Sequence, residues 1–412
     1  MDVSEGATTQ PPATASGELV FHPGELLISR TDTRGVIAAA NGAFRRLSGY
    51  DWDSLIGAPH RLIRHPDMPR GVFRLFWERL QAGLPVGTYV RNREASGRYY
   101  WVFAVALPVE GGYLSVRMKP TGPMFDAIPE LYGRLLRAET ETGADPAQSR
   151  AALIEGVKGL GHESYEDFMA AALCSEYTAR AEQLSRSLER SVVHGRAMSA
   201  AIRAARAHAI RIARLFDEIR NVPTNIRILA AQLEEGSGPI GVISTNHTTL
   251  SDEMLSGVEA FGHAAADTYT AITSGLFLSC TAVLLHEVAD TYAKETDLPE
   301  AIDRSREARL LSATSRACEV RAEEALAGIM AEARRFAEVT AALKRHVAGL
   351  DVTRIMCKIE NARFRHATSG LTEIIDNLEE VQAQIGTQLT EIEKASQAIQ
   401  ATARRASAQR VA

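Results

Sequence analysis

Cysteine is scarce in this sequence, and its spacing matches no common cysteine motif. The four cysteines are Cys174, Cys280, Cys318 and Cys357, and no two of them stand in C-x-x-C spacing. This excludes the usual zinc and thiol redox motifs and offers no disulfide framework. The N-terminal residues MDVSEGATTQPPATASG lack the basic and apolar segments of a signal peptide. We therefore expect a protein of the reducing cytoplasm.

Long uninterrupted apolar segments are also missing. The best membrane candidate is AITSGLFLSCTAVLLHEV at 271–288, and it contains Thr273, Ser274, Ser279, Thr281, His286 and Glu287. A transmembrane helix needs about 20 predominantly apolar residues, and six polar or charged ones are too many. We expect a buried helix of a bundle here and no membrane span.

Motifs for catalysis and for nucleic-acid binding are absent as well. The sequence has no ATP-binding glycine motif, no G-x-S-x-G, no cyclase signature and no phosphotransfer histidine box. His286-Glu287 lacks the second histidine of a zinc protease motif. No His/Cys/Asp cluster has metal-ligand spacing, and no basic run, zinc finger or helix-turn-helix is present. We expect neither an enzyme nor a nucleic-acid partner.

Charge and aromatic residues divide the chain into two parts. Residues 20–120 carry 14 Lys+Arg against 8 Asp+Glu, and the rest of the chain carries 32 against 43, so net charges of +6 and −11 make up the total of −5. Residues 20–120 also hold all three tryptophans and 13 of the 25 aromatic residues. This enrichment favours a dense core or a pocket for a flat ring system.

The aromatic part has the pattern of a mixed α+β domain. Residues 1–19 are predicted to be a disordered leader. LLISRTD and GVIAAAN, and later VGTYVRN, RYYWVFAVALP and YLSVRMK, are strand-like runs separated by turn residues. Short helical stretches lie between the two groups, and the last, PRGVFRLFWERLQAG, has apolar residues at helical spacing and Gly83 as a stop. We predict a five-stranded antiparallel sheet with helices on one face.

The rest of the chain is predicted to be nearly all α-helical. Residues 301–412 contain no proline, and an apolar stripe follows helical spacing at Leu371, Ile374, Ile375, Leu378, Val381, Ile385 and Leu389. Such a stripe predicts a coiled coil or a bundle helix, and we expect it to form a homodimer. EEGSGPIGVIS at 234–244 predicts a turn between two helices. The expected regions are a sheet domain at 21–120, a helical linker or bundle at 121–214, a helical hairpin at 215–260 and a bundle or coiled coil at 261–412.

The segment LIRHPDMPR, residues 62–70, combines two prolines with Arg64, His65 and Asp67. A guanidinium can bind a phosphate through two hydrogen bonds, and a neighbouring imidazole can donate another. Pro66 keeps His65 extended, so the segment is stiff. Asp67 could equally cap a helix that begins near Pro69, and Asn41 could cap the helix of GAFRRL.

Residues 21–119 resemble a PAS domain, and more narrowly the PAS sensor of bacterial aerotaxis receptors. The resemblance is carried by TDTRGVIAAANGAFRRLSGY, LIGAPHRLIRHPDMPRGVFRLFWERLQAG and the run from YVRN to GRYYWVFAVALPV. It implies an FAD cofactor in the PAS pocket and the binding residues Asn41, Arg64, His65, Asp67, Trp77 and Trp101. A haem held by His22, His60 or His65 remains an alternative, as does a scaffold without a cofactor.

A second, shorter resemblance concerns IARLFDEIRNVPTNIRILAAQLEEGSGPIGVISTNHTTLSDEM, which is similar to the signalling hairpin of chemotaxis receptors. It implies chemotaxis-type signalling partners. The tip is shortened to EEGSGP and has no arginine, and no paired glutamate methylation site is present, so we expect weak or no binding of the chemotaxis kinase. Together the two resemblances imply a cytoplasmic redox or oxygen sensor that signals through a dimeric helical region.

Overall fold

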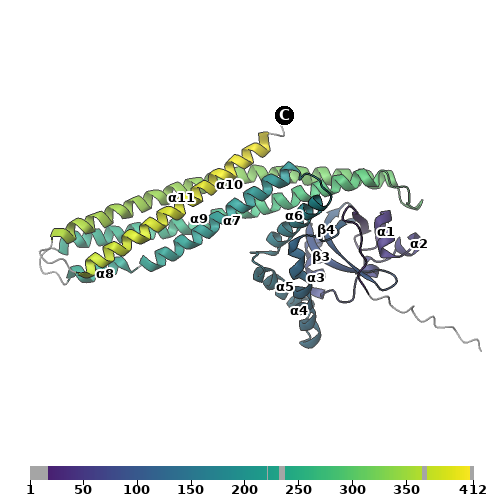
Figure 1. The fold of residues 1–412 in the computed structure, drawn as a ribbon, viewed down its shortest axis with the longest axis horizontal. Coiled ribbons are helices and arrows are strands. Elements are labelled where there is room, and N and C mark those ends of the chain that lie inside the picture. Colours follow the sequence, from purple (N-terminus) through teal and green to yellow (C-terminus); the bar gives the residue numbers. More distant parts are fainter. Residues whose placement is uncertain (1–16, 220, 232–236, 364–368, 409–412) are drawn as a thin grey trace, which may run out of the picture. The chain divides into compact units, whose positions relative to one another are not determined.

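The computed structural model describes residues 17–219, 221–231, 237–363 and 369–408 (Figure 1). The chain forms two compact units. Unit 1 comprises Met1–Val192 and Thr273–Ala322, and unit 2 comprises Val193–Ile272 and Glu323–Ala412. Each unit has a hydrophobic core.

The N-terminal part of unit 1 contains one five-stranded sheet whose paired strands are all antiparallel, as predicted. The strands lie in the order β2-β1-β5-β4-β3. Gly97 and Gly111, in the β3–β4 and β4–β5 turns, have positive φ values of 99° and 76°, which glycine adopts without steric cost. The strands are β1 (Leu27–Asp32), β2 (Ile37–Ala40), β3 (Val86–Arg93), β4 (Tyr99–Val109) and β5 (Gly112–Met118).

Short helices between β2 and β3 cover one face of this sheet. They are α1 (Gly42–Ser48), α2 (Trp52–Leu55), the 3-10 helix η1 (His60–Ile63) and α3 (Arg70–Gln81). Asn41 caps α1, because its side-chain oxygen accepts a hydrogen bond from the Phe44 backbone N–H at 3.1 Å. The predicted capping role of Asn41 and the helices on one face are confirmed.

The start of α3 is capped differently from the expectation. The residue before the helix is Pro69, no side chain of that segment caps it, and the Asp67 carboxylate instead lies 3.4 Å from Arg91. Glu139 provides the missing acceptor, because its carboxylate accepts from the backbone N–H groups of Arg70 at 2.7 Å and Gly71 at 3.3 Å. The prediction that Asp67 caps this helix was therefore wrong: Asp67 lies too far before the first helical residue, and a distant carboxylate fills the position.

The other face of the sheet is covered by helices that follow it in the chain. They are η2 (Pro123–Ala127), α4 (Ile128–Glu141), α5 (Pro146–Gly159) and α6 (Tyr165–Gln183). Trp101 of β4 packs against Phe125 with a ring-centroid distance of 5.3 Å. Glu176 of α6 is fully buried and accepts hydrogen bonds from Tyr89 Oη and from the backbone N–H groups of Thr121 and Gly122. These contacts join the sheet to the helices after it.

Unit 1 also contains the C-terminal end of the long helix α9 (Ser237–Tyr292) and the N-terminal end of the long helix α10 (Arg304–Arg363). Arg30 of β1 makes a two-pronged ion pair with Glu307 of α10, with N–O distances of 2.6 to 3.0 Å. Arg180 of α6 pairs in the same manner with Glu287 of α9. Residues far along the chain thus return to contact the sheet, through Glu307, and helix α6, through Glu287.

Helix α9 is also the one described helix that is long and apolar enough to cross a membrane by length and composition. Its candidate segment is Gly241–Tyr292, and 67% of the most apolar window is buried within the protein. The segment at 271–288 places Ile272, Leu276 and Cys280 among its buried side chains. The helix thus has the burial pattern of a bundle core, as the polar residues in the segment predicted.

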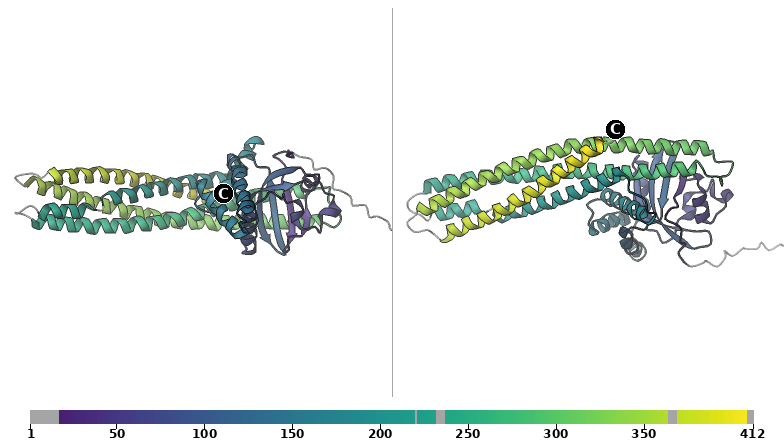
Figure 2. Two further views of the ribbon diagram at one scale, coloured as in Figure 1. Left: turned by 90° about the horizontal axis from the view of Figure 1, so that it is seen from below. Right: turned by 45° about the horizontal axis from the view of Figure 1, so that its top comes forward.

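Unit 2 is a four-helix bundle formed by one chain. Figures 1 and 2 show α7 (Arg190–Ile219), α9, α10 and α11 (Ser369–Ala408) side by side, with the short α8 (Val222–Ala231) at one end. The contacts form a closed ring: His208 to Gln388 joins α7 to α11, Lys344 to Glu393 joins α11 to α10, Phe261 to Phe336 joins α10 to α9, and Tyr269 to Arg206 joins α9 to α7.

The apolar stripe on α11 is buried inside this bundle. Leu378, Ile385 and Leu389 are each at most 1% exposed, whereas the Leu371 side chain lies outside the described set. The predicted bundle helix is confirmed. Because the chain buries this stripe against its own helices, the stripe does not require a second copy.

The prediction of a turn at 234–244 is wrong for residues 237–244. Helix α9 begins at Ser237, so Pro239, Gly241 and the residues up to Ser244 are helical. Pro239 is tolerated because the first helical turn has no intrahelical acceptor for its N–H groups. Residues 232–236, which include much of the EEGSGP tip, lie outside the described residues, so the expected weak kinase binding stays a prediction.

Candidate functional site

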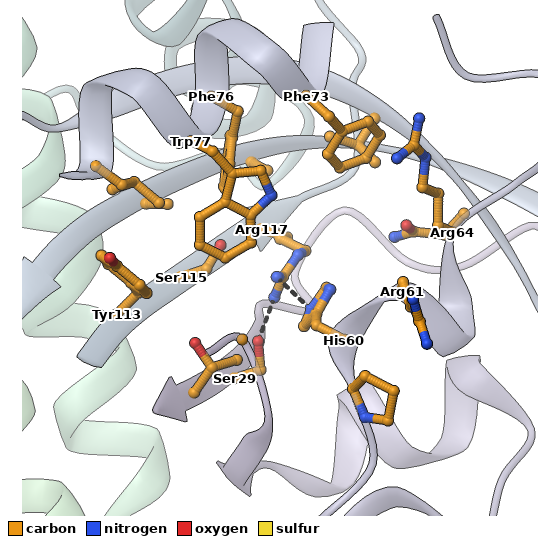
Figure 3. Close-up of a pocket in the computed structure, with 18 of the residues that line it drawn as sticks. Ser29, His60, Arg61, Arg64, Phe73, Phe76, Trp77, Tyr113, Ser115 and Arg117 are labelled. Atoms are coloured by element: carbon orange, nitrogen blue, oxygen red, sulfur yellow. Dashed lines mark hydrogen bonds between the residues drawn. The ribbon is translucent and has the colours of Figure 1, made fainter. Parts of the chain in front are cut away.

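A cavity of about 520 Å³ lies in unit 1 between α3 and the sheet (Figure 3). Its volume is in the usual range for small-molecule and cofactor pockets. Small side chains create the space, because Ala104 and Ala106 of β4 form its floor together with Ser115 of the central strand β5. The lining residues are Ser29, Thr31, Arg34, Gly35, Pro59, His60, Arg61, Arg64, Phe73, Phe76, Trp77, Leu80, Val90, Asn92, Ala104, Ala106, Tyr113, Ser115 and Arg117.

One wall of the cavity is aromatic. Phe73, Phe76 and Trp77 come from α3, and Figure 3 shows the Trp77 indole extending toward the cavity. Tyr113 of β5 packs edge-on against Trp77 with a centroid distance of 5.4 Å. Aromatic side chains on one wall and alanines on the floor suit a planar ring system.

The charged lining is exclusively basic. Arg34, Arg61, Arg64 and Arg117 line the cavity, and none of its described lining residues is an aspartate or glutamate. Arg34 is largely exposed and paired with Asp32, whereas Arg117 is 5% exposed. Cations without carboxylates around a partly closed space attract an anionic ligand.

Arg117 is the most unusual residue of the site. Its guanidinium donates to Ser29 Oγ at 2.9 Å and lies 2.8 Å from His60 Nε2, as the dashed lines in Figure 3 show. Burial lowers the pKa of Arg117 to about 10. Burial and the neighbouring Arg117 charge together hold the pKa of His60 well below its usual value, so His60 is neutral and its Nε2 accepts from Arg117.

Two buried polar groups in the cavity are unsatisfied. The Asn92 side-chain nitrogen and the Ser115 hydroxyl have no hydrogen-bond partner among the described residues. Leaving a buried donor unpaired costs about 1–3 kcal/mol. A ligand with acceptor atoms would satisfy these groups as well as Arg117, which has unused donor capacity.

The RHPD turn, residues 64–67, contributes one side chain to the cavity, that of Arg64. A backbone bridge between Arg64 and Asn92 holds the turn against β3. The Arg64 guanidinium stacks on Phe73 with its carbon 3.8 Å from the ring centroid, and burial lowers the Arg64 pKa. Arg64 and Trp77 are thus the two predicted residues that the structure brings together at the cavity.

The other four predicted residues lie outside the cavity lining. The Asn41 amide is used by the Phe44 and Ile28 N–H groups and by the Leu26 carbonyl. His65 accepts from the Asp67 backbone N–H through Nδ1 at 3.1 Å.

The Asp67 side chain is 60% exposed. Trp101 lies on the opposite face of the sheet, because successive residues of a strand point to opposite faces.

Asn92, Ser115 and Arg117 line the cavity but were not among the residues predicted from the sequence. In YLSVRMK, the cavity residues Tyr113, Ser115 and Arg117 alternate with the buried Leu114 and Val116. Arg117 could have been identified from this alternation. It is a charged residue on one face of a strand whose other face is apolar.

The geometry distinguishes the three histidines considered as haem ligands. His22 accepts from the Gly24 N–H, and neither His22 nor His65 lines the cavity. His60 does line it, but its Nε2 faces Arg117 at 2.8 Å. An axial ligand needs that lone pair, so haem binding through His60 would require the Arg117 contact to break.

Comparison with known proteins identifies the class of this fold. Residues 37–116 match the family model of the PAS fold. The N-terminal part of the chain is therefore a PAS domain, and it is followed by a long helical region.

Among curated proteins, the chain is 40% identical over 119 residues to the aerotaxis receptor of Escherichia coli (strain K12). The match covers 28% of this chain and 24% of the receptor, so the chain spans about a quarter of that relative's length.

Solved structures that match part of this chain include a PAS domain and a LOV domain. One is the PAS domain of a protein from Colwellia psychrerythraea, with 21% identity and a TM-score of 0.21 over 23% of this chain and 86% of that one. The other is the LOV domain from Erythrobacter litoralis EL346 blue-light activated histidine kinase, with 18% identity and a TM-score of 0.21 over 22% and 90%.

Proposed function

We propose that this protein is a non-enzymatic redox or oxygen sensor whose PAS domain binds FAD. The observation that carries the proposal is the cavity itself, in which an aromatic wall and four arginines surround a space whose described lining residues include no carboxylate. A flavin dinucleotide combines a planar ring with an anionic pyrophosphate. The aerotaxis-receptor resemblance supports this choice of ligand.

The residues of the cavity fit the two parts of such a ligand. Phe76 and Trp77 would pack against the ring, and Asn92, Ser115 and Arg117 would donate to acceptor atoms at its edge. Arg64 would hold a phosphate at the cavity margin, because a guanidinium matches phosphate oxygens through paired hydrogen bonds. When bound, a flavin supplies a ring whose charge and hydrogen bonding change on reduction.

Strand β1 offers a route from this cavity to the long helices. Ser29 and Thr31 line the cavity, whereas Arg30 between them points to the other side and pairs with Glu307 of α10. A change in the Arg117–Ser29 contact would therefore act on a strand that also holds α10. The proposed output is a shift of α10 between two packings, in a helical region that acts as a dimer and engages chemotaxis-type signalling proteins.

Purification of the full-length protein tests the proposal. We expect a yellow protein with flavin absorption near ~450 nm, and release of FAD on denaturation. Arg117→Met should retain less flavin, and the midpoint potential of what remains should fall, because the lost cation no longer stabilises added negative charge. Arg134→Met, an exposed arginine of α4 outside the cavity, is the matched control.

Two outcomes would overturn the proposal. An intense band near ~400 nm that disappears in His60→Ala would identify haem as the ligand. A colourless protein that takes up neither cofactor would favour a scaffold in which the PAS domain only makes protein contacts. Circular dichroism of each variant shows whether the fold is retained.

A further inference from the structure

Helix α10 has two apolar seams in unit 2, and one of them is exposed. The buried seam faces the bundle and includes Phe336, Leu343, Val347 and Leu350, each at most 8% exposed. The second seam runs along the outer side of the same helix. Its most exposed apolar members are Val352, Ile355 and Ile359, at 56%, 48% and 51% exposed, and Met356 lies beside them at 44%.

The exposed seam has coiled-coil spacing. Exposed residues follow one another at alternating steps of four and three over about three heptads. All but one are apolar. The positions are Ala341, Arg345, Ala348, Val352, Ile355, Ile359 and Ala362. A strict repeat of 3.5 residues keeps a stripe facing one partner helix, whereas scattered surface hydrophobic residues show no such period.

We propose that this seam is where two copies of the chain associate, with α10 of one copy packed antiparallel against α10 of the other. The inference rests on the proposed function, which includes a dimeric helical region. It adds the surface through which that dimer forms. The occupant is a second copy because the seam is self-complementary, as an isologous two-fold contact requires.

The charges select the antiparallel arrangement. A parallel pair brings like positions together and sets Arg345 against Arg345 of the second copy within the seam. In the antiparallel register, Val352 faces Ile355 of the second copy and Ile359 faces Ala348. Arg345 then lies opposite Ala362 at the end of the seam, where its guanidinium can reach water.

The same register pairs opposite charges beside the seam. Asp351 and Lys358 flank it one heptad apart, and the antiparallel contact places Asp351 of each copy beside Lys358 of the other. Among the described residues of one chain these groups make long ion pairs, 3.8 Å from Asp351 to Arg354 and 3.6 Å from Lys358 to Glu379. The two-fold axis forms the intermolecular pair twice.

Sedimentation velocity of the full-length protein at micromolar concentrations tests this surface. We expect a concentration-dependent dimer, and a monomer for the double variant Val352→Lys/Ile359→Lys. Val320→Lys, a 52% exposed valine on α10 outside the seam, is the matched control and should still dimerise. Circular dichroism should be unchanged, because all three side chains are exposed.

Charge reversal and cross-linking test the orientation. Asp351→Lys should weaken dimerisation by about tenfold, and adding Lys358→Asp should restore it. A mixture of Val352→Cys and Ile355→Cys proteins should form a disulfide-linked heterodimer. Efficient linking of Val352→Cys to itself would indicate a parallel pair and contradict the register.

A wild-type protein that stays monomeric, or a Val352→Lys/Ile359→Lys variant that dimerises like the wild type, would overturn the proposal. A monomer that binds a different protein through the seam would do so too. Flavin content is measured in the same samples. A wild-type monomer with full flavin content would contradict the proposed seam alone. A dimer without flavin would contradict the proposed function alone.

Discussion

At the scale of single residues, the most unusual feature of the cavity is Arg117, a buried cation whose hydrogen-bond partners are uncharged. Arg117 contacts a serine and a neutral histidine, and burial lowers its pKa. A buried charge without a counter-ion is costly unless a ligand compensates it. Arg117 is therefore better explained by an anionic or electron-rich ligand than by packing.

The RHPD turn allows a paired test of ligand contact against structure. Arg64→Ala should bind flavin about tenfold or more weakly and therefore lose it on dilution, because Arg64 lines the cavity and supplies a charge-assisted contact. Asp67→Ala should keep its flavin and its melting temperature, since Asp67 is 60% exposed and caps no helix. The flavin-to-protein ratio after dialysis measures both. Full flavin occupancy in Arg64→Ala would show that the turn is structural.

His247 in the bundle predicts a loss of stability on acidification. Burial lowers its pKa to about 4, from an ordinary value of 6.5. The unfolded chain therefore binds the proton first, and the stability present above pH 6.5 falls as the pH drops toward 4. The expected loss at pH 5 is about 2 kcal/mol. Urea unfolding of wild type and His247→Leu at pH 7.5 and 5 should show a smaller pH effect in the variant; equal effects would refute the assignment.

At the scale of elements, the N-terminus of α3 is held by a residue from another helix. Glu139 of α4 also accepts from Ser149 Oγ of α5 at 2.5 Å, so one carboxylate joins three helices. Glu139→Ala should lower the free energy of unfolding by about 1–3 kcal/mol, because it leaves buried donors unpaired. Thermal unfolding by circular dichroism measures the change. Glu130→Ala, on the exposed side of α4, should have little effect.

The Arg30–Glu307 pair predicts how the start of α10 is held on the sheet. Both side chains are largely buried, so Glu307→Gln should leave Arg30 without its counter-charge. We expect faster amide exchange at 304–318 with unchanged flavin content. Flavin reduction in the wild type should change exchange in the same segment. If neither Glu307→Gln nor flavin reduction alters amide exchange at 304–318, β1 is excluded as the route from the cavity to α10.

At the scale of the whole molecule, one chain supplies all four helices of the bundle in unit 2. The α11 stripe, which favoured a dimer when read from the sequence, is buried against helices of the same chain. The proposed dimer therefore uses another surface, the outer seam of α10.

The two compact units allow stability and cofactor binding to be separated. Leu378 of α11 is fully buried in unit 2, whereas the cavity belongs to unit 1. Leu378→Ala should destabilise the bundle by about 2–5 kcal/mol without reducing flavin content. A parallel loss of flavin would mean that the two units unfold together. Urea unfolding followed by helix content and by flavin fluorescence compares the two.

The sequence by itself determined the classes of element. The period-two runs, turn glycines and helical apolar spacing predicted the antiparallel sheet, its helices and the helical remainder, because these patterns record which side of each element is buried. The resemblance to aerotaxis-receptor PAS sensors, rather than these patterns, implied Arg64 and Trp77, which both line the cavity. Local chemistry was sufficient where a residue acts on its neighbours in the chain, as Asn41 does at α1.

Only the tertiary structure decided which distant residues meet. Glu139 rather than Asp67 caps α3, Trp101 lies on the face away from the cavity, and Arg117 meets His60 across 57 positions. The α11 stripe finds its partners within the chain, whereas the α10 seam is exposed among the residues that the structure describes. The physical reason is that periodicity shows which face of an element is apolar, but the partner of that face depends on how helices and strands pack in three dimensions.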